Sequence, residues 1–231
     1  MARATPSSSR ATPSSSREPA PFNLLLMVAD PVGNAAPITE DVARSDLTNL
    51  WTGRVQNIDE VTTNLFLAGF VSEGDMMSII RGQPWTLRSH NLLIEMYVPD
   101  RERDDYAFQY LDASIRLYGI PRELRTKDRI REIIQHIGHA SDWHRLNPRS
   151  FNYDPFYVPV RIKLDVSKPA KDKIFHFVPN MGNMIIWLHY EKVKRICTYC
   201  ARFFHNAEHC PGRVRRIMIA SGNQGFNRYG N

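Results

Sequence analysis

Cysteine is scarce in this sequence. The 231 residues include only three, and all of them lie within the fourteen positions from Cys197 to Cys210. An odd number of clustered cysteines excludes the disulfide framework that stabilises small secreted domains. The cysteines therefore predict a reducing compartment and a metal site.

Long apolar runs are also missing. No stretch approaches the roughly 18 to 20 apolar residues of a membrane-spanning helix, and the start lacks the apolar core of a secretory signal. The sequence contains neither a phosphate-cradling glycine loop nor a G-x-S-x-G nucleophile turn. We therefore expect a soluble, intracellular protein of the nucleus or cytoplasm that is not an enzyme and binds neither a membrane nor a small-molecule substrate.

Acidic residues are sparse in the last third of the chain. From Phe156 onward there are 13 Lys and Arg against 4 Asp and Glu, a net charge of +9, so residues 1–155 carry −3 of the total of +6. Clustered basic residues favour polyanionic partners but do not indicate a fold. The C-terminal third is thus the expected region of contact.

The first 37 residues offer little to bury. The segment RATPSSS at residues 3–9 recurs at residues 10–16, and a low-complexity repeat of this composition predicts a disordered tail. An organellar transit peptide is the alternative, because acidic residues are absent before Glu18. The stretch is too rich in Pro and Ser for an amphipathic helix, which favours the simple tail.

Residues 38–190 predict one α+β domain with a mainly antiparallel sheet and two or three helices, of the ferredoxin-like or RNA-recognition type. The expected helices are 41–51, 73–82 capped by Ser72, and 127–137 capped by Thr126, and the expected strands are 54–60, 64–71, 91–98, 112–118, 158–166, 174–178 and 184–190. The helix at 127–137 is the clearest, since four isoleucines recur at helical spacing. In the strand at 158–166, alternate apolar residues face one way and Arg161 and Lys163 the other.

The stretch from Cys197 to Cys210 reads C-x2-C-x4-H-x4-C. Three thiolates and one imidazole fill all four positions of a tetrahedral zinc site, so no position stays open for chemistry and the site is structural. We predict that Cys197, Cys200, His205 and Cys210 bind one Zn²⁺ in a knuckle spanning residues 191–213. His209 is a rival ligand, but its neighbour Cys210 makes a shared tetrahedron difficult, so His205 is preferred.

Five upstream phrases accompany this spacing: NLFLAGF at 64–70, GQPW at 82–85, YGIP at 118–121, LDVSKP at 164–169 and YEKVKRICTYC at 190–200. Together with the knuckle and Pro211 they resemble plant retrotransposon-like proteins of LINE-type elements. In that family an uncharacterised α/β domain precedes a CCHC zinc knuckle, and the similarity covers residues 40–211. The resemblance implies a gag-like protein that binds single-stranded RNA or DNA, with zinc as its cofactor and no catalysis.

Two knuckle positions depart from the family, which has glycine where this chain has Ala201 and Phe204. Glycine suits turns that require positive φ, so a bulky Phe204 is expected to be strained. The departures predict a reduced affinity for zinc and leave open whether this copy belongs to a decaying element.

Single strands are held by basic tracks and by aromatic rings on which bases stack. Tyr199 and Phe203 are the predicted stacking residues, with Phe204 beside them. The predicted phosphate contacts, in the knuckle and in a basic disordered tail at 214–231, are Lys192, Lys194, Arg195, Arg202, Arg213, Arg215 and Arg216. An upstream extension of this track would use Arg161, Lys163, Lys168, Lys171 and Lys173, whereas Trp187 and Tyr190 are expected in the core. Self-association is left open.

Two other interpretations compete with nucleic-acid binding. Zinc knuckles also act as protein-docking modules, and the acidic first two-thirds has no evident RNA surface. The carboxylates of Asp100, Glu102, Asp104 and Asp105 resemble a Mg²⁺ cluster, but their position in a charged run with Arg101 and Arg103 indicates a loop.

Overall fold

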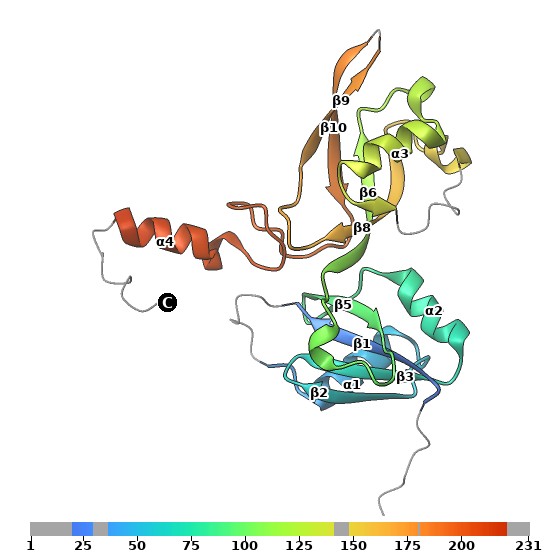
Figure 1. Cartoon of the computed structure of the whole chain (residues 1–231), viewed down its shortest axis with the longest axis vertical. Helices are drawn as coiled ribbons and strands as arrows, with labels where there is room; N and C mark the ends of the chain where they lie inside the picture. Colours follow the sequence, from blue (N-terminus) through green and yellow to red (C-terminus); the bar gives the residue numbers. More distant parts are fainter. Residues whose placement is uncertain (1–19, 30–36, 141–147, 180, 221–231) are drawn as a thin grey trace, which may run out of the picture.

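The computed structural model of the chain describes residues 20–29, 37–140, 148–179 and 181–220. Two five-stranded antiparallel sheets lie one above the other in Figure 1, and four α-helices accompany them in these residues. The predicted α+β fold with mainly antiparallel strands is therefore confirmed. None of the helices in the described ranges is long and apolar enough to cross a membrane.

The first sheet contains the ferredoxin-like arrangement. Its elements are β1 (Phe22–Val28), α1 (Glu40–Leu50), β2 (Asn57–Thr62), β3 (Leu65–Phe70), α2 (Glu73–Gly82), β4 (Thr86–Leu87) and β5 (His90–Met96). The strands lie in the order β2-β3-β1-β5-β4, all antiparallel. Without the short edge strand β4, this is the β-α-β-β-α-β order of the ferredoxin-like fold.

The central strand β1 lies inside the segment predicted to be a disordered tail. For residues 22–28 that prediction is wrong, since β1 pairs with both β3 and β5 and Leu24 and Leu26 are fully buried. The apolar run NLLLM follows a low-complexity repeat and is buried on both faces, so it lacks the alternation of a surface strand. The repeat itself, at residues 3–16, lies outside the described residues.

The two faces of the first sheet have different partners. Leu24, Leu26 and Val28 of β1 pack with α1 and α2 in one hydrophobic cluster. Leu25, on the opposite face because strand residues alternate, joins Leu65 and Leu93 in a second cluster. The sheet is therefore buried on both sides.

The second sheet follows in the chain. It contains β6 (Tyr110–Tyr118), α3 (Lys127–Gln135), β7 (His139–Ala140), β8 (Tyr157–Asp165), β9 (Lys173–Val178) and β10 (Gly182–Tyr190), with strand order β7-β8-β6-β10-β9. Short 3-10 helices are η1 (Arg103–Asp105), η2 (Arg122–Leu124), η4 (Pro148–Asn152) and η5 (Ala207–His209), and the last helix is α4 (Pro211–Ala220). Residues 38–190 thus supply strands to two sheets rather than to the single predicted sheet.

Helix α3 covers one face of the second sheet as its sequence predicts. The Thr126 side chain accepts a hydrogen bond from the Arg129 backbone N–H at 3.4 Å, and Gly138 N–H bonds the Ile134 carbonyl at 3.0 Å. Ile130, Ile133 and Ile134 are buried, while Ile137 packs partly buried at the edge of the same cluster. The inward row of β8, from Val158 to Leu164, lies beneath the helix.

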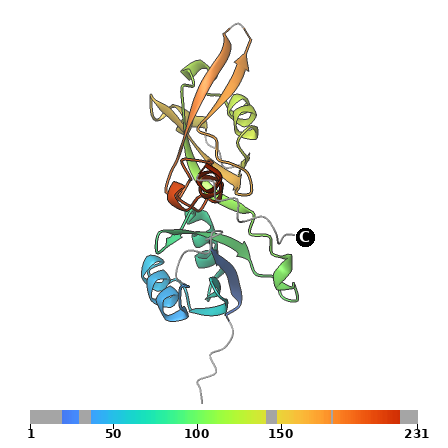
Figure 2. The same cartoon turned by 90° about the vertical axis from the view of Figure 1, so that its left-hand side faces the viewer.

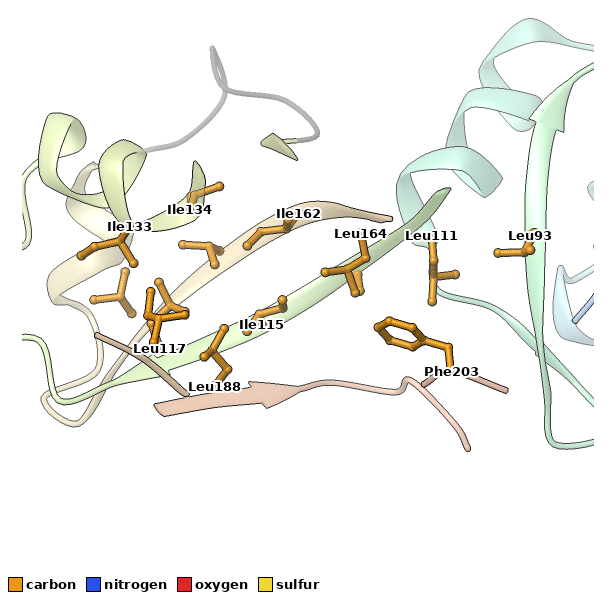
Figure 3. Close-up of a cluster of buried hydrophobic side chains, with 14 of the residues drawn as sticks. Leu93, Leu111, Ile115, Leu117, Ile133, Ile134, Ile162, Leu164, Leu188 and Phe203 are labelled. Carbon is orange, nitrogen blue, oxygen red and sulfur yellow. The ribbon is translucent and has the colours of Figure 1, made fainter. Parts of the chain in front are cut away.

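The larger hydrophobic cluster joins the two sheets. Besides α3 and the inward residues of the second sheet, it includes Leu25, Leu65 and Leu93 of the first sheet and Phe203 and Phe204 near the C-terminus. In Figure 3 Phe203 lies next to Leu111, and Leu93 of β5 lies on the opposite side of Leu111. The segment after β10 therefore packs where the sheets meet.

Of the two aromatic residues expected in the core, one is largely buried and the other is exposed. Tyr190 is largely buried, which raises its pKa to about 12 although a hydrogen bond to Lys171 opposes the shift. Trp187 is 49% exposed, so the prediction that it lies in the core is wrong. Neighbouring residues of a strand face opposite ways, and Leu188 and Ile186 take the inward positions of β10.

The acidic run forms a loop and η1, as predicted. Its side chains are exposed, and the guanidinium of Arg101 lies 4.3 Å from the centroid of the Tyr106 ring. The Tyr106 hydroxyl in turn accepts a hydrogen bond from Val98 N–H at 2.9 Å. The cation and the ring are thus part of the loop's own packing.

Acidification is expected to destabilise the fold through His176. Its imidazole is buried, and Nε2 has no hydrogen-bond partner among the described residues. Burial lowers its pKa, and Arg129 and His136 lower the pKa further, while Glu132, 3.9 Å from Nε2, opposes them. The unfolded state then binds more protons below its own pKa of about 6.5, so stability falls as the pH drops through this range. Urea unfolding at pH 7.5 and pH 6.0 should show a smaller loss for His176→Leu than for wild type. Equal losses in wild type and His176→Leu would contradict this role.

Candidate metal centre

The structure brings the four predicted ligands together. Sγ of Cys197, Cys200 and Cys210 and a ring nitrogen of His205 lie within 4.8 Å of one another. Tetrahedral Zn²⁺ with Zn–S bonds of about 2.3 Å separates two sulfurs by about 3.8 Å, so the donors fit an ion of this size after a small contraction. His209 is exposed in η5 and lies outside the group. The cluster can hold one metal ion.

The orientation of His205 suits metal binding. Its Nδ1 lies 3.2 Å from the Phe203 carbonyl oxygen, and its Nε2 lies 3.3 Å from Cys200 Sγ. A carbonyl only accepts, so Nδ1 must donate and Nε2 keeps its lone pair for the metal. A backbone acceptor behind the ligating histidine is the usual means of fixing its tautomer.

Electrostatics at the thiols differ between the ligands. Burial would raise the pKa of Cys210, but hydrogen bonds from the Arg213 backbone N–H, His205 and the other two thiols lower it to about 6. The pKa of Cys200 is raised, mainly by burial and against a hydrogen bond from the Arg202 N–H. Backbone N–H groups that point at sulfur favour the thiolate, the form that binds metal.

The two positions where the knuckles that this sequence resembles have glycine adopt the expected backbone. Ala201 has φ of 57° and Phe204 has φ of 70°, both in the left-handed region. The prediction of positive φ at these positions is confirmed. The Phe204 side chain is 5% exposed and belongs to the large cluster, so burial of its ring offsets the strain of its backbone, about 1–2 kcal/mol.

Phe203 is not a surface residue. It is 4% exposed and lies edge-on to Tyr190, with ring centroids 6.3 Å apart, and beside Phe204 at 5.8 Å. A ring this deeply buried offers almost no area to a stacked base, so its burial speaks against the prediction that Phe203 stacks on nucleic acid. The reason is that the knuckle does not stand alone: its aromatic residues share the core of the second sheet.

Hydrogen bonds also fix the knuckle to the first sheet. The amide of the buried Asn91 on β5 donates to the Lys194 carbonyl at 2.7 Å and accepts from the Lys194 N–H at 3.1 Å. One residue away, His90 Nδ1 lies 3.4 Å from Arg195 Nη1. The sequence analysis did not identify Asn91; the signal was an asparagine, a residue disfavoured in strands, at the start of an apolar run.

The loop between β8 and β9 forms hydrogen bonds with the knuckle from the second sheet. Ala170 N–H donates to the Ala201 carbonyl at 2.7 Å, and Arg202 Nη1 donates to the Ser167 carbonyl at 3.0 Å. The Tyr190 hydroxyl bonds both backbone groups of Lys171, at 2.8 and 3.1 Å. The metal cluster is thus attached to both sheets.

Most of the predicted phosphate contacts are exposed. These are Lys192, Lys194, Arg202, Arg213, Arg215 and Arg216, while Arg195 is half-buried. Tyr199 is 44% exposed, and its hydrogen bond with Arg216 raises the pKa of that guanidinium. Residues 214–220 of the predicted disordered tail belong to α4, which begins at Pro211, a position where proline is favoured. Residues 221–231 lie outside the described residues.

The five upstream cations divide into two groups. Lys168 pairs with Asp165 at 2.8 Å, and Lys171 Nζ donates to the His136 carbonyl at 2.6 Å, so both are engaged in local structure. Arg161, Lys163 and Lys173 lie on the face of the second sheet opposite α3, as strand alternation requires. A continuous basic track through all five does not form.

A cleft of about 790 Å³ opens between the first sheet and the knuckle. Its apolar lining includes Leu93, Phe108, Phe203 and Phe204, and Arg202 reaches its rim. Three of the four metal ligands, Cys200, His205 and Cys210, also line it. The cleft is therefore part of the metal centre.

A scan against protein-family models found no matching family, and a search of curated proteins found no matching sequence.

Proposed function

We propose that this protein is a zinc-dependent binder of single-stranded RNA or DNA with little sequence preference, derived from a retrotransposon of the plant LINE type. The observation that carries the proposal is the Cys3His cluster flanked by exposed cations and by the exposed pair Tyr199 and Arg216. Soft thiolates with one imidazole favour Zn²⁺ over harder ions. Four protein ligands leave no open position, which supports a structural rather than catalytic role.

The metal positions these groups. Arg202 lies between the second and third ligands, and Arg213, Arg215 and Arg216 begin the helix after the fourth. Because the knuckle is fixed to both sheets, the cations are presented from a rigid base rather than a mobile tail. The similarity of five upstream phrases to LINE-type proteins supports the same function.

A protein-docking role is the second candidate, and one observation favours it. The face of the first sheet that RNA-recognition domains use for base stacking carries Leu25, Leu65 and Leu93, and these are buried in the core shared with the second sheet. These three side chains are aliphatic and buried, so they offer no ring on which a base could stack. Helix α4 also exposes Val214, Ile217 and Met218.

Salt dependence distinguishes the two candidates. We expect fluorescence-anisotropy titrations of 20-nucleotide RNA and DNA across a salt series to show binding. The logarithm of the association constant should fall linearly with the logarithm of the salt concentration. Each phosphate contact on a single strand contributes about 0.7 to the slope, so Arg213→Ala combined with Arg216→Ala should reduce it by about 1.4. The exposed Arg54, replaced by Ala, is the matched control and should leave the slope unchanged. Absence of binding by metal-loaded protein at low salt would favour the docking role.

A further inference from the structure

The face of the second sheet opposite α3 is exposed along β9 and β10. Along β9, Ile174, His176 and Val178 are buried toward α3, while Phe175 and Phe177 point the other way and are 63% and 65% exposed. We call this surface the open face. A pair of exposed phenylalanines on one strand is costly in water and marks a contact surface.

The strand register extends this surface across the sheet. Lys173 pairs with Trp187, Trp187 with Tyr118, and Tyr118 with Tyr157, so one row of these four residues crosses β9, β10, β6 and β8. Directly paired residues share a face. The adjacent pair, Phe175 and Ile185, lies beside this row, and Ile185 is 43% exposed.

Cations sit against the rings of the open face. Lys173 Nζ lies 5.1 Å from the Trp187 ring centroid, and Arg116 Cζ lies 4.6 Å from that of Tyr157. The Tyr118 and Tyr157 rings are 5.5 Å apart. Glu191 forms an ion pair with Arg116. Lys163 continues the positive charge along β8, whereas Arg161 Nη2 donates to the Ile80 carbonyl of α2 at 3.3 Å.

We propose that the open face is a stacking surface for the bases of single-stranded nucleic acid, with Phe175, Phe177 and Trp187 as its principal contacts. The proposal rests on the function proposed above and places a second contact surface outside the knuckle. Exposed rings on one sheet face, about 7 Å apart along a strand, can receive successive unstacked bases. Adjacent cations can then contact the phosphates.

Charge favours this occupant over an apolar protein surface. A protein that covered the rings would also bury Lys173 and would have to supply a carboxylate there, since an unpaired buried cation is costly. A polyanion supplies phosphates along its whole length. Figure 1 shows α4, with its three arginines, projecting on the side away from α3, and Figure 2 shows the same helix end-on below the β9–β10 hairpin. The basic helix and the open face therefore lie on the same side of the second sheet.

The test uses the full-length, metal-loaded protein and a 20-nucleotide oligouridine carrying 4-thiouridine. Phe175→Ala combined with Trp187→Ala should weaken binding by at least about fivefold, the lower limit for loss of one stacked base. Tyr97→Ala, which removes a half-exposed ring from the first sheet, should leave the affinity unchanged. Photocrosslinks on wild-type protein should map to peptides containing residues 173–178 or 182–190, a readout independent of how the variant folds.

Three outcomes would overturn the proposal. Unchanged affinity of the double variant, with crosslinks confined to the knuckle and α4, would refute the open face and leave the proposed function standing. Absence of binding by wild type at low salt would refute both. A dimer in sedimentation that the double variant dissociates, with oligonucleotide affinity unchanged, would assign the open face to self-association instead.

Discussion

Replacing Cys200 with Ser, or removing the metal with a strong chelator, is expected to lower the melting temperature of the whole protein by at least about 8–16 °C. Structural zinc contributes an apparent binding free energy of about 10–16 kcal/mol in zinc-finger peptides. If metal binding stabilises the whole fold by about 4 kcal/mol, loss of the metal gives the stated fall in melting temperature for a chain of this size. The metal cluster is linked to the fold because Phe203 and Phe204 belong to the hydrophobic cluster that joins both sheets.

The two neighbouring histidines provide a matched pair for this experiment. His205→Asn should reproduce the loss seen for Cys200→Ser, since His205 is in the ligand cluster, while His209→Asn should melt like wild type because His209 is exposed. Metal content by mass spectrometry should be one zinc per chain for wild type and His209→Asn. Melting unaffected by chelation of a zinc-loaded sample would show that the knuckle does not support the sheets.

The elements that could be predicted from sequence are those with strong local signals. Helix α3 has four isoleucines at helical spacing between Thr126 and Gly138, and β8 alternates cleanly, so both were placed within about two residues of their ends. Strand β1 was missed because it is buried on both faces and follows a repeat that indicates disorder. Its place at the centre of the first sheet depends on pairing with β3 and β5, which no local pattern reveals.

At the metal centre the ligands could be predicted because spacing and donor chemistry are local. The burial of Phe203 in the core could not be predicted, since a ring between two ligands is expected to be exposed when the knuckle is considered alone. Asn91 bonds Lys194 across 103 positions of the chain, a distance over which sequence pattern says nothing. The exposure of Trp187 likewise depends on which face α3 covers.

The arrangement of the first sheet changes how the fold should be interpreted. In RNA-recognition domains the face opposite the helices is free to bind bases. Here that face is aliphatic and is buried against the second sheet and the knuckle through Leu25, Leu65 and Leu93. Exposed aromatic rings lie on the second sheet instead, so the ferredoxin-like topology alone would direct attention to a face that is buried.

Replacing Arg125 with Ala is expected to destabilise the protein by about 3 kcal/mol or more. Arg125 is buried, and burial lowers its pKa. Its guanidinium donates to four carbonyls: Ile120 at 2.9 Å, Phe151 at 3.2 Å, Asp154 at 2.7 Å and Pro155 at 2.9 Å. Removing the donor leaves buried carbonyls unpaired, at about 1–3 kcal/mol for each that water cannot reach.

Loss of these hydrogen bonds should also disturb the open face, because Asp154 and Pro155 lie three and two residues before Tyr157. Urea denaturation should show a lower midpoint for Arg125→Ala, whereas Arg122→Ala, an alteration three residues away in the partly exposed η2, should shift it by less than about 0.5 kcal/mol. Arg125→Lys should restore little of the lost stability, since one ammonium group cannot reproduce the planar guanidinium that bonds four carbonyls. Full stability of Arg125→Lys would mean that the positive charge alone, rather than the guanidinium hydrogen bonds, holds the segment before β8 in place.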